Sequence, residues 1–175
     1  MTDPARGRRP RRVLLRPPVL AWALYDWANS AFAATVLAGF FPVFFKTWWN
    51  AGVAPDVSTS RLGTAIVAAS VIVAVAAPVL GAIGDSLGGR KRLLACFAVT
   101  GILATAALYA VPEGAWFAAA AVYVVATACF ALANVFNDSL LVDVCEQAGT
   151  RSRALVSGYG YALGYLGGGL LLLLN

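Results

Sequence analysis

The sequence has 175 residues, of which 61% are hydrophobic and only 12% charged, and its mean hydropathy is +0.78. A water-soluble domain carries roughly 25% charged residues, so this composition excludes an ordinary soluble domain and predicts a chain that lies largely in lipid. Histidine is absent, which excludes histidine-based catalysis and histidine-containing zinc sites. The formal charge of +5 does not indicate nucleic-acid binding, because the basic residues gather before and between apolar runs.

Residues 1–17 are a basic tail, which holds six of the 13 Lys and Arg residues. A basic segment directly before an apolar helix is a topology signal and a contact for anionic lipid. The apolar run that follows is about 27 residues long, well beyond the usual secretory h-region of about 7–15, so we expect a retained first helix. The tail contains Arg6, Arg8, Arg9, Arg11, Arg12 and Arg16.

Residues 18–175 are predicted to form an all-α, polytopic transmembrane helix bundle. A helix needs roughly 20 apolar residues to cross the hydrocarbon, and five runs are long enough. Pro42 and Pro78 lie inside runs, where a proline usually produces a kink. The five predicted spans cover residues 19–45, 62–84, 93–111, 115–142 and 154–174.

The orientation follows from the basic residues near the ends of the spans. If the tail is cytoplasmic, eleven of the 13 basic residues lie inside, and only Lys46 and Arg61 lie outside. This predicts a multi-pass protein with a cytoplasmic N-terminus. We expect its location to be the bacterial inner membrane. A group of aromatic residues then falls at the outer interface, where such rings are favoured. The group is Phe44, Phe45, Trp48, Trp49 and Trp116.

Polar side chains occur at membrane depth in the first and fourth spans. Asp26 lies roughly 12 Å along the first helix, and Asn29 follows on the same face. In the fourth span Asn134 and Asp138 share a face, with Asn137 beside them. A carboxylate in hydrocarbon is costly unless it faces a cavity or a partner, so we predict a polar cavity that binds solute, or a coupling proton carried on Asp26 or Asp138. Interhelical hydrogen bonding that holds the bundle together is the alternative.

The loop between the second and third spans, residues 81–92, combines glycines, an acid and basic residues. Glycine allows a short turn and a close approach of helices, and the acid can pair with a basic residue. We predict a cytoplasmic gating contact, with a purely topological basic loop as the alternative. Asp143, at the end of the fourth span, is placed to pair with this loop, and a solvated helix end is the alternative. The loop residues are Gly81, Asp85, Gly88, Arg90 and Lys91.

The fifth span carries a glycine stripe. Gly160, Gly164 and Gly168 are four apart, which gives a smooth face that another backbone can approach closely. Tyr161 and Tyr165 form a parallel stripe. We expect plain helix packing here, and contact with a solute is the alternative.

The loop of residues 81–92 resembles the signature between the second and third helices of major facilitator superfamily transporters. Ser86 stands where that family usually has a basic residue, whereas Arg90 and Lys91 match its terminal basic pair. Asp143 is placed like the acid at the end of the family's fourth helix. The resemblance implies twelve helices in two six-helix halves that work by alternating access around a central cavity.

Two longer stretches, Trp22–Phe32 and Ser157–Gly169, look like the vacuole-effluxer-like branch of that superfamily. This branch includes a fungal vacuolar amino-acid effluxer and many bacterial permeases of unassigned substrate. The resemblance covers roughly residue 21 to the end. It implies that the chain is most of an N-terminal half, and the ending directly after Leu174 suggests a truncated or incomplete product.

The leading hypothesis is secondary active transport of a small solute, with amino acids as candidates, driven by protons or another ion. The expected partners are the solute and the lipid bilayer, with no nucleic acid. The alternative is a non-transporting membrane scaffold or assembly subunit that uses the glycine-rich fifth helix. No P-loop, dinucleotide fingerprint, metal cluster or nucleophile–base set occurs, so the sequence predicts neither an enzyme nor a cofactor.

Overall fold

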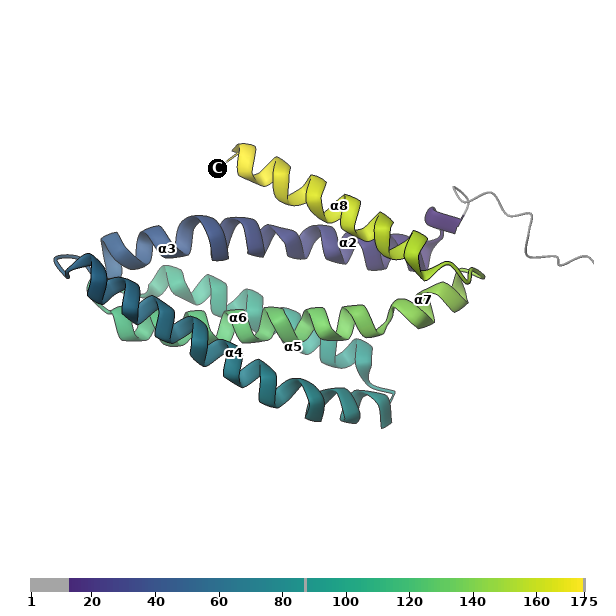
Figure 1. Cartoon of the computed structure of the whole chain (residues 1–175), viewed down its shortest axis with the longest axis horizontal. Coiled ribbons are helices and arrows are strands. Elements are labelled where there is room, and N and C mark those ends of the chain that lie inside the picture. Colours follow the sequence, from purple (N-terminus) through teal and green to yellow (C-terminus); the bar gives the residue numbers. More distant parts are fainter. Residues whose placement is uncertain (1–12, 87, 175) are drawn as a thin grey trace, which may run out of the picture. The chain divides into compact units, whose positions relative to one another are not determined.

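The computed structural model describes residues 13–86 and 88–174, and it is almost entirely helical (Figure 1). Five helical stretches are long and apolar enough to cross a membrane, which confirms the predicted all-α bundle and its number of spans. No strand occurs in this part of the chain. Five arginines of the basic tail, Arg6, Arg8, Arg9, Arg11 and Arg12, lie outside the described residues.

The first stretch is Pro17–Trp49, and it changes its winding along its length. Pro17 and Pro18 are favourable at its first positions, because the backbone N–H groups of the first helical turn have no intrahelical acceptor. Around Pro42, which cannot donate a backbone hydrogen bond, π-helical turns replace the regular α-helix on both sides. The stretch is made of α2 (Pro17–Ala31), η2 (Phe32–Phe40), α3 (Phe41–Phe44) and η3 (Phe45–Trp49).

The other four stretches follow in chain order. The second is α4 (Pro55–Ser86), which contains Pro78, and the third is α5 (Arg90–Ala107) continued by η4 (Leu108–Ala110). The fourth is α6 (Trp116–Ser139) followed by α7 (Leu141–Gln147), and the fifth is α8 (Arg153–Leu174). Gly114, with a positive φ of 75°, allows the tight turn before α6.

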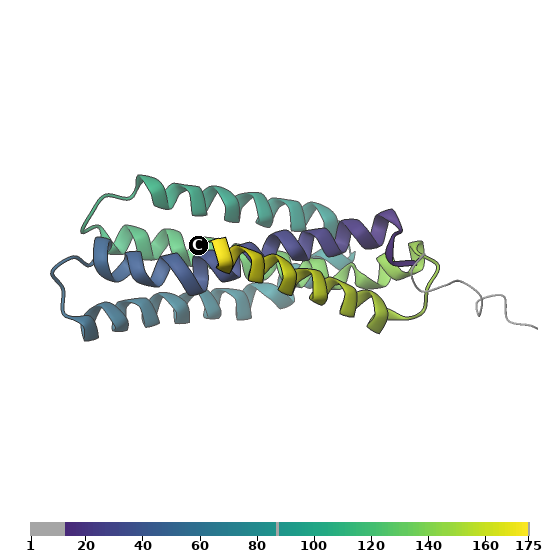
Figure 2. The ribbon, with the colours of Figure 1, turned by 90° about the horizontal axis from the view of Figure 1, so that it is seen from above.

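The described chain forms two compact units. The first contains the described residues of Met1–Ala34 and Asn137–Asn175, and the second contains those of Thr35–Phe136. In the first unit α8 lies along α2, as both views show (Figures 1 and 2). In the second unit α4, α5 and the later part of the first stretch, from Phe41 to Trp49, pack against α6 through apolar residues.

Aromatic rings build the core of the second unit. Phe41 stacks on Tyr123 with a ring-centroid distance of 3.8 Å, and it also contacts Phe45 and Trp49. Small residues opposite these rings let the helices approach, since Ala65, Ala119 and Ala120 belong to the same core.

The aromatic group expected at the outer interface divides between two environments. Phe45 and Trp49 are buried, with exposed fractions of 0% and 6%, whereas Phe44 and Trp48 are each 46% exposed. The indole Nε1 of Trp49 donates to the carbonyl oxygen of Val111 at 3.2 Å. The group therefore contributes both to the protein core and to the surface.

Arg61 joins three segments at the same end of the second unit. Its Nη1 donates to Oδ1 of Asn50 at 2.7 Å, and its guanidinium lies 4.0 Å from the centroid of the Trp116 ring. Asn50 in turn donates to the carbonyl oxygen of Phe45 at 2.8 Å. Arg61 thus holds the loop after η3 against the start of α6, in addition to carrying charge.

Candidate functional site

The contact between α2 and α8 depends on glycine. A Cβ atom added at Gly160 would collide with the ring of Trp22, and one added at Gly167 would lie 2.5 Å from the ring of Trp27. At Gly164 the added atom would lie 2.9 Å from Oγ of Ser30. Glycine at these positions therefore lets large and polar side chains of α2 lie directly on the α8 backbone. Gly168 is less tightly packed, since its nearest neighbours would lie 3.8 Å away.

A pocket of about 420 Å³ opens beside this contact. Its polar groups come from α2, where the Ser30 hydroxyl donates to the backbone oxygen of Asp26 at 2.9 Å. Its aromatic groups come from α8, and the remaining wall consists of small or aliphatic residues. The lining residues are Asp26, Ser30, Ala33, Ala34, Tyr161, Gly164, Tyr165, Gly168, Gly169 and Leu172.

The two membrane-depth carboxylates fall in the same unit. Asp26 is partly buried at the pocket, and Asp138, which is exposed on α6, lies within electrostatic range of it. Asn137 is 2% exposed. Asn29 is partly buried on α2, one turn from the pocket residue Asp26, whereas Asn134 belongs to the second unit.

The fourth stretch is interrupted beside these carboxylates. α6 ends at Ser139 and α7 begins at Leu141, so the regular hydrogen-bond ladder stops at Leu140. The carbonyl oxygen of Asn137 accepts a 3.1 Å bond from the Leu140 N–H and a buried 2.8 Å bond from Nε1 of Trp22. Interrupted helices are tolerated at membrane depth where other groups satisfy the released backbone atoms, as the Trp22 indole does here.

Trp22 is the site residue that sequence reasoning did not single out. It is 7% exposed, it lies on Gly160 of α8, and it donates to the interruption between α6 and α7. It therefore connects α2 and α8 to the end of α6 at Asn137. An aromatic N–H donor in an otherwise apolar turn, four residues before Asp26, is the signal that could have drawn attention to it.

Replacing Trp22 with phenylalanine is expected to lower the free energy of unfolding by about 1–3 kcal/mol, because a carbonyl oxygen in an apolar interior loses its donor. The measurement is the thermal unfolding midpoint of the detergent-solubilised protein. Trp48→Phe serves as the control, since Trp48 is 46% exposed and the same change should leave the midpoint nearly unchanged. Equal midpoints for Trp22→Phe and the parent protein would show that the indole bond does not stabilise the fold.

The loop of residues 81–92 contains an ion pair. Oδ1 of Asp85 lies 2.8 Å from both Nε and Nη2 of Arg90. Gly88, with a φ of 61°, allows the turn between them. Lys91 is exposed, and Asp143 is partly buried on α7 of the first unit. Pairing of Asp143 with this loop stays a prediction.

Of the loop's glycines, Gly84 has the closest neighbours. A Cβ at Gly84 would lie 3.1 Å from the ring of Phe136, whereas nothing would lie within 4 Å at Gly81 or Gly88. Gly81, the glycine predicted from the motif, is therefore open in this structure. The close contact belongs to the glycine three residues later.

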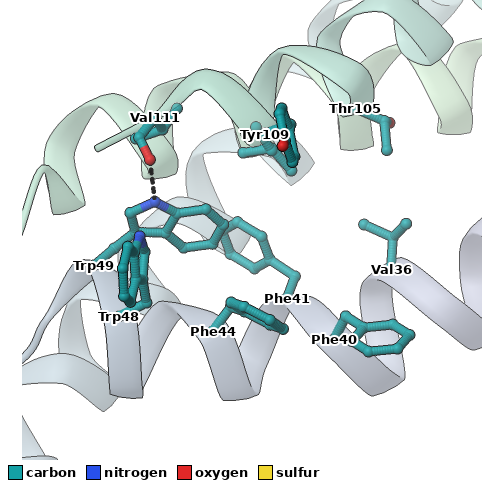
Figure 3. Close-up of a pocket in the computed structure, with 10 residues that line it drawn as sticks. Val36, Phe40, Phe41, Phe44, Trp48, Trp49, Thr105, Tyr109 and Val111 are labelled. Atoms are coloured by element: carbon teal, nitrogen blue, oxygen red, sulfur yellow. Dashed lines mark hydrogen bonds between the residues drawn. The ribbon is translucent and has the colours of Figure 1, made fainter. Parts of the chain in front are cut away.

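A second, strongly aromatic pocket of about 390 Å³ lies in the second unit (Figure 3). Phe40, Phe41 and Phe44 line one wall, and Thr105 and Tyr109 of the third stretch lie across from them (Figure 3). Neither Lys, Arg, Asp nor Glu lines it. It offers apolar surface without a charged group to orient a solute, so the pocket at Asp26 is the stronger candidate site.

Comparison with known proteins agrees with the motifs. A family model described as "Vacuole effluxer Atg22 like" matches residues 15–175, almost the whole chain. The chain belongs to this family. This confirms the predicted resemblance to major facilitator transporters of the vacuole-effluxer-like branch, and the chain is a multi-pass membrane protein.

A curated bacterial relative supports the same assignment. The chain is 38% identical over 148 residues to an uncharacterized MFS-type transporter, YxiO, of Bacillus subtilis (strain 168). The match covers 84% of this chain and 34% of that protein, so the chain spans about a third of the length of this relative. No solved structure matches the chain.

Proposed function

We propose that the protein moves a small solute across the membrane by alternating access, and that this chain supplies the helices around Asp26. Membership in the Atg22-like family and the transporter name of the bacterial relative support this proposal. The observation that carries it is the pocket at Asp26, which places a carboxylate beside a space of about 420 Å³ within membrane-spanning helices. A carboxylate at such depth is by default a candidate functional residue.

The two carboxylates have different roles in the proposed transport, one in contact with the solute and the other in ion coupling. Asp26 contacts the solute, because it lines the pocket. Asp138 is the second candidate for ion coupling, since it lies within electrostatic range of Asp26 at the interrupted end of α6. A cation that binds near one carboxylate lowers the cost of keeping the other charged, which would link an ion to the solute. Amino acids are the candidate solutes, and protons or another cation would drive transport.

The Asp85–Arg90 ion pair is proposed to take part in the conformational change, with Lys91 and Asp143 as further contacts. Asp85 is exposed and Arg90 is partly exposed, so the pair adds little to overall stability, but it can favour one of two states by a small free energy. We propose a cytoplasmic N-terminus, because eleven of the 13 basic residues then face the cytoplasm. We also propose a location in the bacterial inner membrane, which the bacterial relative supports.

The test uses the full-length protein in proteoliposomes. The probes are a radiolabelled amino-acid mixture and an enclosed pH-sensitive dye. Asp26→Asn and Asp138→Asn should each reduce solute flux by about tenfold or more and change its pH dependence, since the amide side chain cannot take up and release a proton. Asp56→Asn is the matched control, because Asp56 is exposed in the first turn of α4, outside the pocket. Unchanged flux and unchanged pH dependence in both test variants would contradict the proposal.

The glycine-rich fifth helix does not favour the scaffold alternative. Gly160, Gly164 and Gly167 pack against α2 of the same chain. The face expected to bind a second subunit is therefore already covered within the first unit.

A further inference from the structure

We infer that the pocket between α2 and α8 binds the ammonium group of a small amine whose apolar body lies along α8. The inference deepens the proposed function, on which it rests, because it assigns a chemical class of solute to the same pocket. The distribution of charge along the spans, the groups that line the pocket and the pocket volume all favour such a ligand.

The middle parts of the spans contain aspartates but no lysine, arginine or histidine. The sequence has no Lys or Arg in residues 17–45, 62–89, 93–150 or 154–175, and it has no histidine. Asp26 and Asp138 lie inside two of these segments. A carboxylate at membrane depth is paired, as a rule, with a cation or a polar group. Lys and Arg occur in the helical stretches only near their ends, so the middle of these stretches has no basic side chain to pair with Asp26, and a bound cationic ligand is well suited to do so.

The polar groups of the pocket are suited to accept hydrogen bonds. The Asp26 carboxylate has only acceptor sites when it is ionised. The Ser30 hydroxyl already uses its proton to donate to the backbone oxygen of Asp26, so its own oxygen is left to accept. An ammonium group has three donors and no acceptor, which matches this arrangement. An anionic solute would instead meet a negative charge.

The aromatic residues of the pocket suit the same ligand. Tyr161 and Tyr165 line it from successive turns of α8 and are 63% and 80% exposed, so their rings are accessible. A cation within about 6 Å of an aromatic ring centroid is attracted by the ring. Leu172 and the glycines beside the rings provide apolar surface for the rest of the molecule.

The pocket volume favours an organic cation over a bare ion. A water molecule occupies about 30 Å³ of the liquid, and a dehydrated metal ion needs no more room than this. The pocket measures about 420 Å³, within the range of roughly 300–1,000 Å³ typical of small-molecule sites. A proton or a metal ion alone would leave most of this space empty.

The test measures binding to the full-length protein in detergent by isothermal titration, without any transport. The probe is 2-phenylethylamine, and 2-phenylethanol is its neutral analogue of nearly the same shape. The amine should bind at least about tenfold more tightly than the alcohol. Asp26→Asn should remove this preference, whereas Asp56→Asn should keep it, because Asp56 is an exposed carboxylate outside the pocket.

A second pair of variants tests the aromatic contribution. Tyr165→Leu should weaken amine binding several-fold, whereas Tyr165→Phe, which keeps the ring, should bind nearly as well as the parent protein. Size-exclusion profiles identical to that of the parent protein establish that each variant is folded.

Equal affinity for amine and alcohol would overturn the inference, as would undiminished amine binding by Asp26→Asn. Competition by Na⁺ as effective as that by the amine would assign the pocket to an inorganic ion and would also overturn it. Amine binding in a protein that shows no flux in proteoliposomes would support the site while contradicting the transport proposal. Flux without amine binding would support the transport proposal while contradicting the amine site.

Discussion

Phe41→Ala is expected to lower the free energy of unfolding by about 3 kcal/mol, since it opens a cavity in a close-packed aromatic core. Phe41 is 2% exposed and stacks on Tyr123 with nearly parallel rings, 12° apart. It also contacts Phe45 and Trp49, so its removal deprives three further rings of a neighbour. The thermal unfolding midpoint and the yield of monodisperse protein in detergent would both fall.

The control for this change lies in the same short helix, α3. Phe44 is 46% exposed, and Phe44→Ala removes the same atoms from a position that contacts the surroundings of the protein. We expect a change of about 0.5 kcal/mol or less there. If the two variants lost equal stability, the packing assigned to Phe41 would be wrong.

Gly160→Ala is the second change with a large expected effect, because a single methyl group would enter the ring of Trp22. The indole cannot turn away easily, since its Nε1 donates to the buried carbonyl oxygen of Asn137. Either α2 and α8 separate or the hydrogen bond is lost, at a cost of about 1–3 kcal/mol. The unfolding midpoint should fall, and the tryptophan emission maximum of the protein should shift as the indole of Trp22 becomes more exposed.

Gly158→Ala gives a matched control on the same helix. Nothing would lie within 4 Å of a Cβ atom at Gly158, and alanine favours a helix over glycine by up to about 1 kcal/mol. This variant should therefore be as stable as the parent protein or slightly more stable. A fall in midpoint as large as that of Gly160→Ala would indicate that glycine is needed for helix flexibility, and not for the contact with Trp22.

Residue spacing predicts which face of a helix is smooth, but it does not predict which side chain of another helix packs there. The spacing of Gly160 and Gly164 predicts a smooth face, but it does not identify what lies on that face. The contact with Trp22 joins residues far apart in the chain, and so does the indole bond to Asn137, across 115 positions. No local periodicity encodes a pairing over such a separation.

The burial of the aromatic residues near the end of the first span could not be predicted from their spacing either. Phe44 and Phe45 are adjacent and chemically identical, yet one is exposed and the other fully buried. The π-helical turns on both sides of Pro42 change the number of residues per turn, so a regular helical period assigns these faces incorrectly. Only the path of the backbone determines which ring enters the core.

Composition, the lengths of the apolar runs and the Gly81–Arg92 motif were enough to predict five spans and the transporter family, because lipid admits few other arrangements for such a chain. The helix interruption at Leu140, the role of Trp22 and the pocket that joins Asp26 to Tyr161 and Tyr165 required the folded structure. These features depend on atoms of different helices that meet within a few ångströms. Hydrophobicity places each helix in the membrane, whereas side-chain packing and hydrogen bonds decide which of its faces meet.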